Sequence, residues 1–503
     1  MVPWVSRPDE DQLNSLPLNE NQASKGMRSE ILSGVNKTIQ RSITTAMHCK
    51  TPFKRIAIIG GGPAGLAAAR GLTEEPGDFE VDLFERKKRV GGVWDYTGQK
   101  SKALEKWQHG GTGQGGRDEA ISAIYKNMET NITSWLMAYS QHPFPKNSEK
   151  YPSRSEVEDY VESYRDRFVR VRALHTNTDV QRVRKENGEW TVSCEDLSTG
   201  HRFDGVYDAV VVANGHFERP YIPSGIPGLE EWRQRDPSCF SHAKYFDDPE
   251  DFRDKTVLVV GAGPSGTDVA LQVAVGARQV YLSARRPSAS PDLSAVGVRN
   301  VSEIVRYDGA TRTATTIDGT ELADINKVVF CTGYLYDFPF LDSYRSGPKG
   351  ILDGGARLLN LYRQIFYIYD PSLAFLALQK SVVPMPLAES QAAVVGRVFS
   401  GRLPLPSVDD MTRAFHHDIE RYGPGIHTLN FPLDVEYCRE LQEWLDESAT
   451  TAPGLQPLRW DDAHYEARRT SAEEKSVRLA KVAAHAATLK AARKPFNFPP
   501  RDH

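Results

Sequence analysis

Two short stretches of this 503-residue chain have the residue types and spacing of a dinucleotide-binding turn. They are RIAIIGGGPAGLAAA at residues 55–69 and TVLVVGAGPSGTDVA at residues 256–270. In each, an apolar strand pattern runs into a Gly-x-Gly-x-x-Gly turn and then into a helix pattern. The first glycine permits the tight turn, the second lets a pyrophosphate approach the backbone, and the third brings helix and strand together. The N–H groups at the helix start can then bind the phosphates.

The residues that end the following strand differ between the two units. In the first, VDLFE ends in Glu85, whose carboxylate can accept hydrogen bonds from ribose hydroxyls. In the second, QVYLSARR ends in Arg285 and Arg286, whose guanidinium groups can bind a 2′-phosphate that an acid would repel. This contrast predicts FAD in the first unit and NADPH in the second, with hydride passing between them. The alternative for the first unit is a glycine turn with a purely structural role. The alternative for the second unit is that Arg285 and Arg286 are simply solvated and bind no phosphate.

Short apolar runs predict the strands that position these turns. These strands lie at residues 55–60, 80–85, 189–195, 207–213, 256–260, 279–284, 327–331 and 373–378. Helical patterns fall between several of them, and together with the two turns they indicate an α/β fold with two Rossmann-like dinucleotide-binding units.

Three further segments have recognisable local patterns. SEVEDYVESYRDRF, at residues 155–168, has apolar residues at helical spacing and follows a serine able to cap it. Ser471 and Glu474 predict a capping box ahead of an alanine-rich helix through about Arg493, docked on the surface or contacting a second subunit. HGGTGQGGRDE, at residues 109–119, predicts a long loop.

Composition favours small-molecule chemistry. The net charge of −4 offers no broad basic surface, so nucleic acid is not expected as a partner. Five cysteines lie far apart with no metal-ligand spacing, which predicts free thiols, no metal site and a reducing compartment. No apolar run reaches the length of a membrane span and the N-terminus lacks a signal-peptide pattern, so we expect a cytoplasmic protein with no membrane partner. Nothing in the sequence decides the oligomeric state, and a homodimer stays open.

Several motifs, in order along the chain, resemble the class B flavin-containing monooxygenases, especially the fungal members. They include GGGPAG, GGVW at 91–94, YKNMETN at 125–131, VVVANGH, GAGPSG, FCTGY at 330–334, LNLYRQIF and PLAESQ. The resemblance extends from about residue 54 to residue 465. It implies an NADPH-binding domain inserted into a FAD-binding domain, with VVVANGH and FCTGY as the two linkers.

The resemblance and the composition together predict the domain boundaries. The chain is expected to begin with a disordered or surface-lying extension (1–46), followed by the first segment of the FAD domain (47–216) and the NADPH domain (217–333). The second segment of the FAD domain (334–465) and a C-terminal helical tail (466–503) complete it.

The resemblance also implies the reaction. NADPH reduces the flavin, the reduced flavin captures O₂ as a C4a-hydroperoxide, and a soft nucleophile of a small molecule attacks the distal oxygen. We expect N-oxygenation of an alkaloid-like amine in secondary metabolism, with S-oxygenation second. Phe246 stands where Baeyer–Villiger relatives usually have tryptophan, which makes ketone oxidation less expected. A disulfide reductase is disfavoured because no CxxC pair occurs. An NADPH oxidase releasing H₂O₂ and a non-catalytic redox sensor that binds FAD and NADPH remain as alternatives.

Site residues follow from the two turns and from the matched motifs. Asn131 matches the active-site asparagine of the family, whose amide can hydrogen-bond the peroxyflavin and NADP⁺; the alternative is an asparagine capping a turn. For Trp94 and Gln391, flavin contact competes with a scaffold role. The expected cofactor-binding residues are Gly60, Gly62, Pro63, Ala64, Gly65, Glu85, Arg86, Gly92, Val93, Trp94, Asn131, Val180, Gln391, Gly261, Gly263, Pro264, Ser265, Gly266, Ser283, Arg285, Arg286, His242, Thr332 and Gly333.

The family fingerprint is incomplete in DPSCFSHAKYF, residues 236–246. Asp236 and Ser238 replace its phenylalanine and glycine, and Asp247 stands where many relatives have an arginine facing NADP. These departures predict altered geometry and affinity of the nicotinamide nucleotide pocket. The retained His242 either orients the NADP-bound state or is a structural histidine at a domain junction.

Overall fold

A computed structural model describes residues 53–98, 100–109, 120–286, 292–448 and 454–500. Apart from residues 405–407, these belong to one compact unit. The predictions for the extension 1–46 and for nearly all of the loop 109–119 lie outside the described residues.

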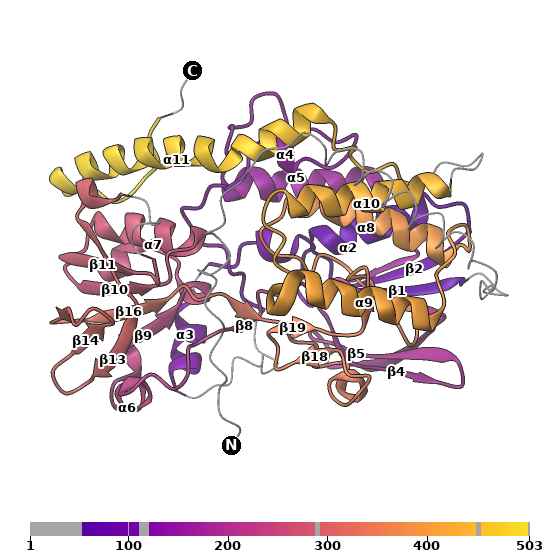
Figure 1. The fold of residues 1–503 in the computed structure, drawn as a ribbon, viewed down its shortest axis with the longest axis horizontal. Coiled ribbons are helices and arrows are strands. Elements are labelled where there is room, and N and C mark those ends of the chain that lie inside the picture. The colour runs from indigo at the N-terminus through magenta and orange to yellow at the C-terminus, as the bar shows by residue number, and fades with distance from the viewer. Residues whose placement is uncertain (1–52, 99, 110–119, 287–291, 449–453, 501–503) are drawn as a thin grey trace, which may run out of the picture. The chain divides into compact units, whose positions relative to one another are not determined.

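The first sheet has seven strands and carries the first glycine turn (Figure 1). In spatial order they are β20 (Leu361–Tyr362), β21 (Phe366–Tyr367), β22 (Leu373–Phe375), β7 (Ala209–Val212), β1 (Arg55–Ile59), β2 (Glu80–Phe84) and β3 (Ala173–His175). The five strands from β22 to β3 are parallel. The residues of β22, β7, β1 and β2 are almost all buried, as in a sheet covered by helices, whereas Leu174 of the edge strand β3 is exposed.

Helices α2 (Pro63–Thr73) and α8 (Pro384–Phe399) pack closely beside this sheet. Glycines permit the contact: a Cβ on Gly71 would lie 2.8 Å from the carbonyl oxygen of Ala392, and one on Gly396 would lie 2.9 Å from that of Gly71. The helix that begins at the first glycine turn is therefore held by a helix from the far end of the chain.

The second sheet has five parallel strands and carries the second glycine turn. In spatial order they are β12 (Val298–Val301), β11 (Gln279–Ser283), β10 (Thr256–Val260), β16 (Lys327–Phe330) and β9 (Phe240–His242). Helix α7 (Pro264–Ala274) packs on it. The chain leaves the first sheet after β7 and re-enters it at β20, so the second nucleotide unit is inserted into the first, which confirms the predicted fold class. The exact domain boundaries remain predictions.

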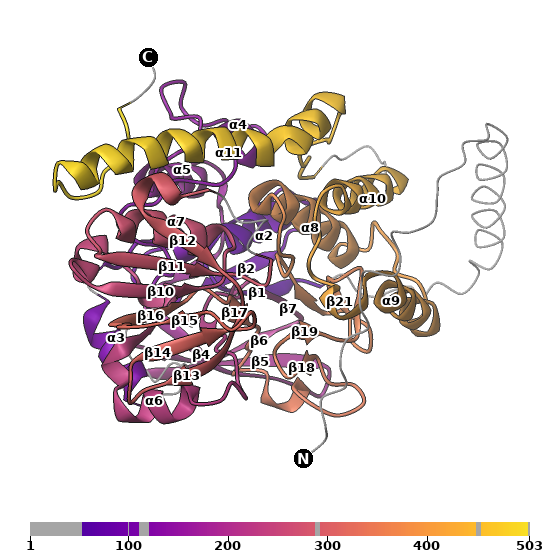
Figure 2. The ribbon, with the colours of Figure 1, turned by 60° about the vertical axis from the view of Figure 1, so that its left-hand side comes forward.

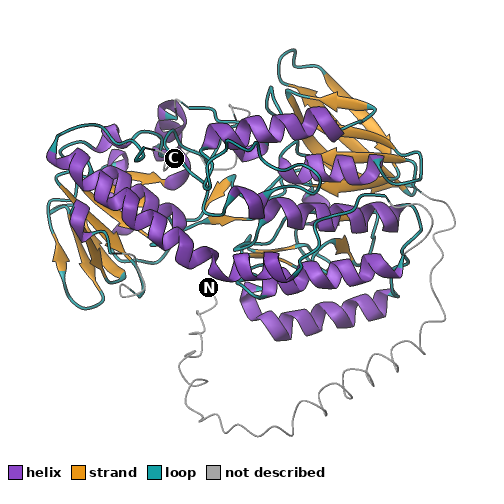
Figure 3. Ribbon diagram, turned by 90° about the horizontal axis from the view of Figure 1, so that it is seen from above, coloured by secondary structure: helices purple, strands orange, loops and turns teal. Residues whose placement is uncertain are grey.

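Smaller sheets and further helices complete the described chain. The strands are β4 (Thr178–Glu186), β5 (Glu189–Asp196), β6 (Arg202–Tyr207), β8 (Arg219–Pro220), β13 (Ile304–Asp308), β14 (Thr313–Thr316), β15 (Glu321–Leu322), β17 (Tyr334–Leu335), β18 (Leu352–Asp353) and β19 (Arg357–Leu358). The helices are α3 (Ser101–Gln108), α4 (Ser134–Met137), α5 (Arg154–Phe168), α6 (Leu229–Arg235), α9 (Val408–Tyr422), α10 (Leu433–Glu447) and α11 (Asp462–Ala491). In the view from above, the long helices (purple) lie in front of the strands (orange) (Figure 3).

All eight predicted strands are present, as β1, β2, β5, β7, β10, β11, β16 and β22. The helix predicted at 155–168 begins one residue earlier, and Ser153 and Glu156 form its capping box. The capping box predicted at Ser471 and Glu474 is wrong. Helix α11 already begins at Asp462, with Asp461 as its cap, because no glycine or proline interrupts the residues between the two positions.

The long C-terminal helix α11 contacts both nucleotide-binding units of the chain. It packs on α4 and on α7 (Figures 1 and 2). Its Val482, Ala483, Ala486 and Leu489 are buried in the same apolar cluster as α7. Despite its length it is too polar for a bilayer, and no helix in the described ranges is both long and apolar enough to cross one.

Candidate active site

The first glycine turn is sterically restricted to glycine at two of its positions. Gly60 has φ +106°, and a Cβ there would lie 2.5 Å from the carbonyl oxygen of Ala213. A Cβ on Gly65 would lie 1.8 Å from the carbonyl oxygen of Gly60. The first and third glycines therefore have the roles that the motif predicts, a tight turn and a close approach of strand and helix.

The start of α2 is left open for an anion. Its N-cap is Gly62, which has no side chain to accept a hydrogen bond, and no acid stands in the first turn, Pro63, Ala64 and Gly65. Helix α5, by contrast, is closed by a capping box. The free N–H groups and the positive end of the α2 dipole fit a pyrophosphate.

Glu85 lies beside this turn and is almost fully buried. Its two carboxylate oxygens accept hydrogen bonds from the backbone N–H of Gly61 at 2.8 Å and of Lys87 at 2.7 Å. Burial raises the pKa of the carboxyl group. Each oxygen keeps a second lone pair, so Glu85 can also accept from ribose hydroxyls. The neighbouring Arg86 instead pairs with Glu218 at 3.3 Å.

The GGVW segment packs directly on the first turn. A Cβ on Gly92 would lie 2.7 Å from the Cα of Gly62. Lys87 holds the segment, since its Nζ donates to the carbonyl oxygens of Gly92 at 2.8 Å and Asp95 at 2.9 Å. The sequence pattern did not indicate this role for Lys87. Trp94 is half-buried at the end of the short helix that begins at Gly92, and the carbonyl of Val93 accepts a hydrogen bond from Ser122.

The second glycine turn repeats the first with one informative difference. Gly261 has φ +105° and faces the carbonyl oxygen of Cys331, and a Cβ on Gly266 would lie 1.7 Å from the carbonyl oxygen of Gly261. At Gly263, the N-cap of α7, a Cβ would meet no heavy atom of the described residues within 4 Å. The protein itself therefore does not require glycine at position 263. Helix α7 starts with Pro264 and Ser265 and has no acid in its first turn, which again fits a phosphate.

The two arginines after β11 are exposed. Among the described residues, the side chain of Arg285 makes a long contact, from its Nε to Glu303 at 3.4 Å. Ser283, before them, is buried, and its hydroxyl donates to the carbonyl oxygen of Ser302 at 2.9 Å. The end of the strand is thus fixed while the Arg285 guanidinium can turn towards a ligand. Such an arrangement fits recognition of a 2′-phosphate.

The chain segment just after the first linker is joined to the end of the second linker. Strands β8 and β17 pair, and Tyr221 N–H donates to the carbonyl oxygen of Gly333 at 2.9 Å. The Thr332 hydroxyl donates to the carbonyl oxygen of Tyr221. Hydrogen bonds therefore join the two chain segments where they cross between the domains.

His242 is part of the same junction and is completely buried. Its Nδ1 accepts the backbone N–H of Lys244 at 3.1 Å, so Nε2 carries the proton and donates to the carbonyl oxygen of Gly333 at 3.1 Å. Burial lowers its pKa to about 3, which keeps it neutral. These contacts support the structural alternative for His242.

The incomplete fingerprint is rigidly held in spite of its substitutions. Asp247 accepts a hydrogen bond from the Tyr96 hydroxyl at 2.8 Å, and Asp236 pairs with Arg312 at 2.6 Å. The buried Lys100 donates to the carbonyl oxygens of Lys244 at 3.1 Å and Phe246 at 2.9 Å. Burial lowers the pKa of Lys100 to about 7. The Lys100 contacts have no signal in the sequence.

Asn131 is exposed, and the backbone before it is anchored from two sides. Thr130 N–H donates to the carbonyl oxygen of Pro152 at 2.9 Å. From α11, Lys475 Nζ donates to the carbonyl oxygen of Thr130 at 2.8 Å and pairs with Glu129 at 2.7 Å. Residues more than three hundred positions away in the sequence therefore hold the asparagine segment.

The segment leading to Asn131 is also tied to helix α7 of the second nucleotide unit. The Tyr125 hydroxyl donates to Asp268, and Gln272 Nε2 donates to Asp268 at 3.0 Å and to the carbonyl oxygen of Asn127 at 2.5 Å. Burial raises the pKa of Asp268 to about 6. These bonds link residues 125–131, the segment that ends at Asn131, to the helix that follows the second glycine turn.

Two expected cofactor residues, Gln391 and Val180, have contacts within the scaffold of the protein. Gln391 is fully buried, and its amide oxygen accepts from the Ala377 N–H at 2.8 Å. Its amide nitrogen donates to Gln379 at 3.1 Å and to the Tyr437 hydroxyl at 2.9 Å, so both N–H groups are used within the protein. Val180 lies in β4, packed in the apolar core. Their predicted cofactor contacts remain predictions.

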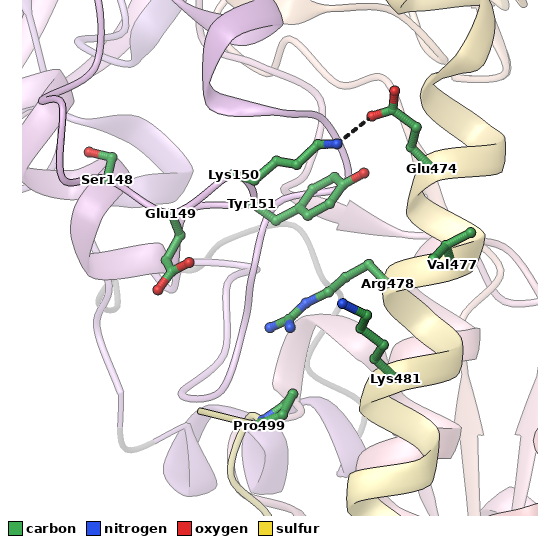
Figure 4. Close-up of a pocket in the computed structure, with 9 residues that line it drawn as sticks. All are labelled: Ser148, Glu149, Lys150, Tyr151, Glu474, Val477, Arg478, Lys481 and Pro499. Atoms are coloured by element: carbon green, nitrogen blue, oxygen red, sulfur yellow. Dashed lines mark ion pairs between the residues drawn. The ribbon is translucent and has the colours of Figure 1, made fainter. Parts of the chain in front are cut away.

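A cavity of about 380 Å³ lies between residues 148–151 and helix α11 (Figure 4). Lys150 pairs across it with Glu474 at 2.8 Å. Tyr151 contributes a buried hydroxyl that has no hydrogen-bond partner among the described residues. The other charged lining residues are Glu149, Arg478 and Lys481, and Arg478 pairs with Glu129 at 2.9 Å.

The flavin-binding monooxygenase-like family model matches residues 53–294 and 291–465. The chain belongs to this family. It is 35% identical over 455 residues to a thiol-specific monooxygenase of Saccharomyces cerevisiae, covering 89% of this chain and 98% of that protein. The chain is therefore a flavin-dependent monooxygenase with FAD and NADPH as its cofactors, which confirms the two predicted cofactors. The assignment of each nucleotide to one of the two turns remains a prediction.

Two other similar proteins extend this comparison within the family. A flavin-containing monooxygenase of Arabidopsis thaliana, GS-OX-like 3, is 30% identical over 452 residues, covering 82% of this chain and 96% of that protein. The solved structure of S-allyl-L-cysteine S-oxygenase from Allium sativum superposes with a TM-score of 0.72 at 25% identity, covering 88% of this chain and 99% of that one.

Proposed function

We propose that this monooxygenase inserts an oxygen atom from O₂ into a soft sulfur atom, a thiol or a thioether, of a small molecule. The main observation behind this proposal is that the N-termini of α2 and α7 have no capping side chain. The first lies beside Glu85, which suits FAD, and the second precedes strand β11 and the Arg285 that follows it, which suits NADPH. The sulfur preference is supported by the relatives whose names state a substrate, a thiol-specific monooxygenase and an S-allyl-L-cysteine S-oxygenase. This reverses the order expected from the sequence, where an alkaloid-like amine came first.

Each protein group has a defined task in this proposal. The N–H groups at the starts of α2 and α7 bind the two pyrophosphates, Glu85 accepts the ribose hydroxyls, and Arg285 binds the 2′-phosphate. FAD bound at this site, once reduced by NADPH, would supply the activated oxygen. Asn131 donates its amide N–H to the reacting oxygen, while Lys475 fixes the carbonyl that precedes it. The protein needs no acid–base triad for this chemistry.

The cellular compartment and the oligomeric state are part of the same proposal. The four described cysteines, Cys194, Cys239, Cys331 and Cys438, are all free, which suits the expected reducing, cytoplasmic compartment. A homodimer stays a prediction.

A substrate screen with product analysis tests the proposal. The purified FAD-loaded protein is mixed with NADPH, O₂ and one compound at a time from matched sets of thiols, thioethers, amines and ketones, and the product mass and H₂O₂ are measured. We expect an added oxygen atom on sulfur with little H₂O₂. Oxygen added only to amines would show that the protein is an N-oxygenase, as the sequence first suggested. Oxygen added only to ketones would show that it is a Baeyer–Villiger enzyme. H₂O₂ in proportion to NADPH with every compound would indicate an oxidase, and no NADPH oxidation a redox sensor.

A further inference from the structure

Two ionisable side chains that the proposed mechanism does not use lie past the carboxyl edge of the first sheet. Strands β7 and β22 are parallel neighbours in that sheet. The chain segment after β7 carries His216, and the segment after β22 carries Lys380. In open α/β sheets, ligands bind outside the carboxyl ends of the strands. The placement of these two residues therefore raises the question of what they bind.

Lys380 is a partly buried cation without a counter-ion. Its Nζ lies 4.4 Å from the centroid of the Tyr336 ring and 3.4 Å from the carbonyl oxygen of Tyr334. No carboxylate pairs with it within the described ranges, and Asp337, which follows Tyr336, is paired with Arg345 at 3.0 Å. Withdrawing an ammonium group from water without a compensating charge is unfavourable. An anionic ligand group would supply that charge.

His216 faces the same aromatic ring and has an unused nitrogen. It is 9% exposed, and its ring centroid lies 5.4 Å from that of Tyr336. Its Nδ1 is buried and has no hydrogen-bond partner in the portion of the chain that the structure describes. Lys380 contributes to lowering the His216 pKa, second to burial, so the neutral imidazole is favoured and Nδ1 can accept a hydrogen bond.

The third group around Tyr336 brings no charge to the cluster. The ring of His427 lies 5.3 Å from that of Tyr336. Its Nε2 accepts the Leu358 N–H at 2.9 Å, so its Nδ1 carries the proton and donates to Gln364 at 2.7 Å. His427 is thus neutral and fully bonded, and only Lys380 and His216 have capacity left for a ligand.

We infer that Lys380 and His216 form a subsite for the α-amino-acid end of the substrate. Lys380 pairs with the carboxylate, and the Nδ1 of His216 accepts a hydrogen bond from the ammonium group. Tyr334, at the end of the second linker, and Tyr336, two residues later, provide the backbone and aromatic surface beside them. This inference rests on the proposed function, and it narrows the substrates to sulfur-containing amino acids or molecules that end in one.

A pair of substrates that differ only in charge tests the assignment of Lys380. S-methyl-L-cysteine and its methyl ester have the same sulfur and ammonium groups, but only the first has a carboxylate. The Lys380→Met variant is compared with the wild type and with Lys349→Met. Lys349 is a matched control because its ammonium group also lies over a tyrosine ring, that of Tyr369 at 4.7 Å. All three are purified with FAD bound.

Binding to the oxidised holoenzyme, measured by calorimetry, reports on the subsite without turnover. We expect Lys380→Met to weaken the acid at least tenfold and to change the ester less than twofold, with Lys349→Met unchanged for both. The KM for NADPH should not move. The inference is overturned if the wild type binds the acid no better than the ester, if the variant weakens both equally, or if it raises the KM for NADPH, because the anion would then be a nucleotide phosphate.

A second variant tests the other half of the subsite. His216→Phe should weaken the acid and the ester alike, since both keep the ammonium group, but should not weaken N-acetyl-S-methyl-L-cysteine. Equal loss for all three compounds would remove His216 from the subsite. If the acid binds in a Lys380-dependent way but no sulfoxide forms with NADPH and O₂, the proposed function fails while the subsite stands.

Discussion

Replacing Gly263 by alanine separates a nucleotide-binding glycine from a structural one. Its backbone, at φ −69° and ψ −177°, is ordinary extended geometry that alanine adopts, and an added Cβ would meet none of the described atoms within 4 Å. The free energy of unfolding should therefore stay the same or rise by up to about 1 kcal/mol, because alanine restricts the unfolded chain. The protein gives no other reason for glycine at this position.

The expected loss is confined to NADPH. The second glycine of the motif lets the pyrophosphate reach the backbone, and a methyl group there pushes the phosphate away from the N–H donors. Losing one hydrogen bond to a charged group costs about 1.5–3 kcal/mol, which corresponds to roughly 10- to 150-fold in Kd. FAD content should not change, since the first turn lies in the other sheet.

Anaerobic flavin reduction at increasing NADPH concentration measures this Kd directly, and thermal unfolding measures stability in the same preparation. Gly266→Ala is the matched control, because its Cβ would lie 1.7 Å from the carbonyl oxygen of Gly261 and must distort the turn itself. It should lose stability as well as NADPH affinity. A Gly263→Ala variant that is reduced with the wild-type Kd would refute the assignment of this turn to NADPH.

Three other changes have expected outcomes. Arg285→Ala should weaken NADPH about 10- to 100-fold and NADH less than twofold, with the exposed Arg306→Ala as control; equal weakening of both nucleotides would exclude a 2′-phosphate contact. Asn131→Ala should retain FAD and oxidise NADPH but release H₂O₂ in place of oxygenated product, whereas coupled turnover would remove its role. Because the folded-state pKa of His242, about 3, is below the ordinary 6.5, its contribution to stability is complete above pH 6.5 and is lost as the pH falls towards 3. The wild-type unfolding free energy should therefore drop more steeply over that range than in His242→Gln, by up to about 1.4 kcal/mol per pH unit, and parallel curves would contradict the buried neutral state.

The two glycine turns, the eight strands and the two cofactors could all be predicted from the sequence, while the contacts of Glu85 with FAD and of Arg285 with NADPH remain predictions. Each depends on residues close together in the chain, where the backbone links the turn, the helix start and the end of the next strand. The central strands of the two sheets, such as β7 and β10, are almost entirely buried, so they appear as continuous apolar runs. Local sequence patterns were therefore sufficient to predict the cofactors and the fold class.

Contacts between distant segments of the chain could not be predicted. The sequence near Asn131 contains no sign that Lys475 holds its segment, and nothing near Gln391 shows that its amide is used by Tyr437. Helix α11 began nine residues before the predicted capping box, because a local capping pattern cannot exclude an earlier start.

The cluster of Lys380 and His216 is another feature that depends on contacts between distant segments and could not be predicted from the sequence. Each residue is unremarkable in its own segment, and only the pairing of β22 with β7 brings the two segments together at one edge of the sheet. The sequence by itself determined which nucleotides the chain is expected to bind, since each predicted site is built from residues close together in the chain. The tertiary structure alone decided which distant side chains lie beside the candidate site, because proximity in space between distant residues leaves no spacing in the sequence.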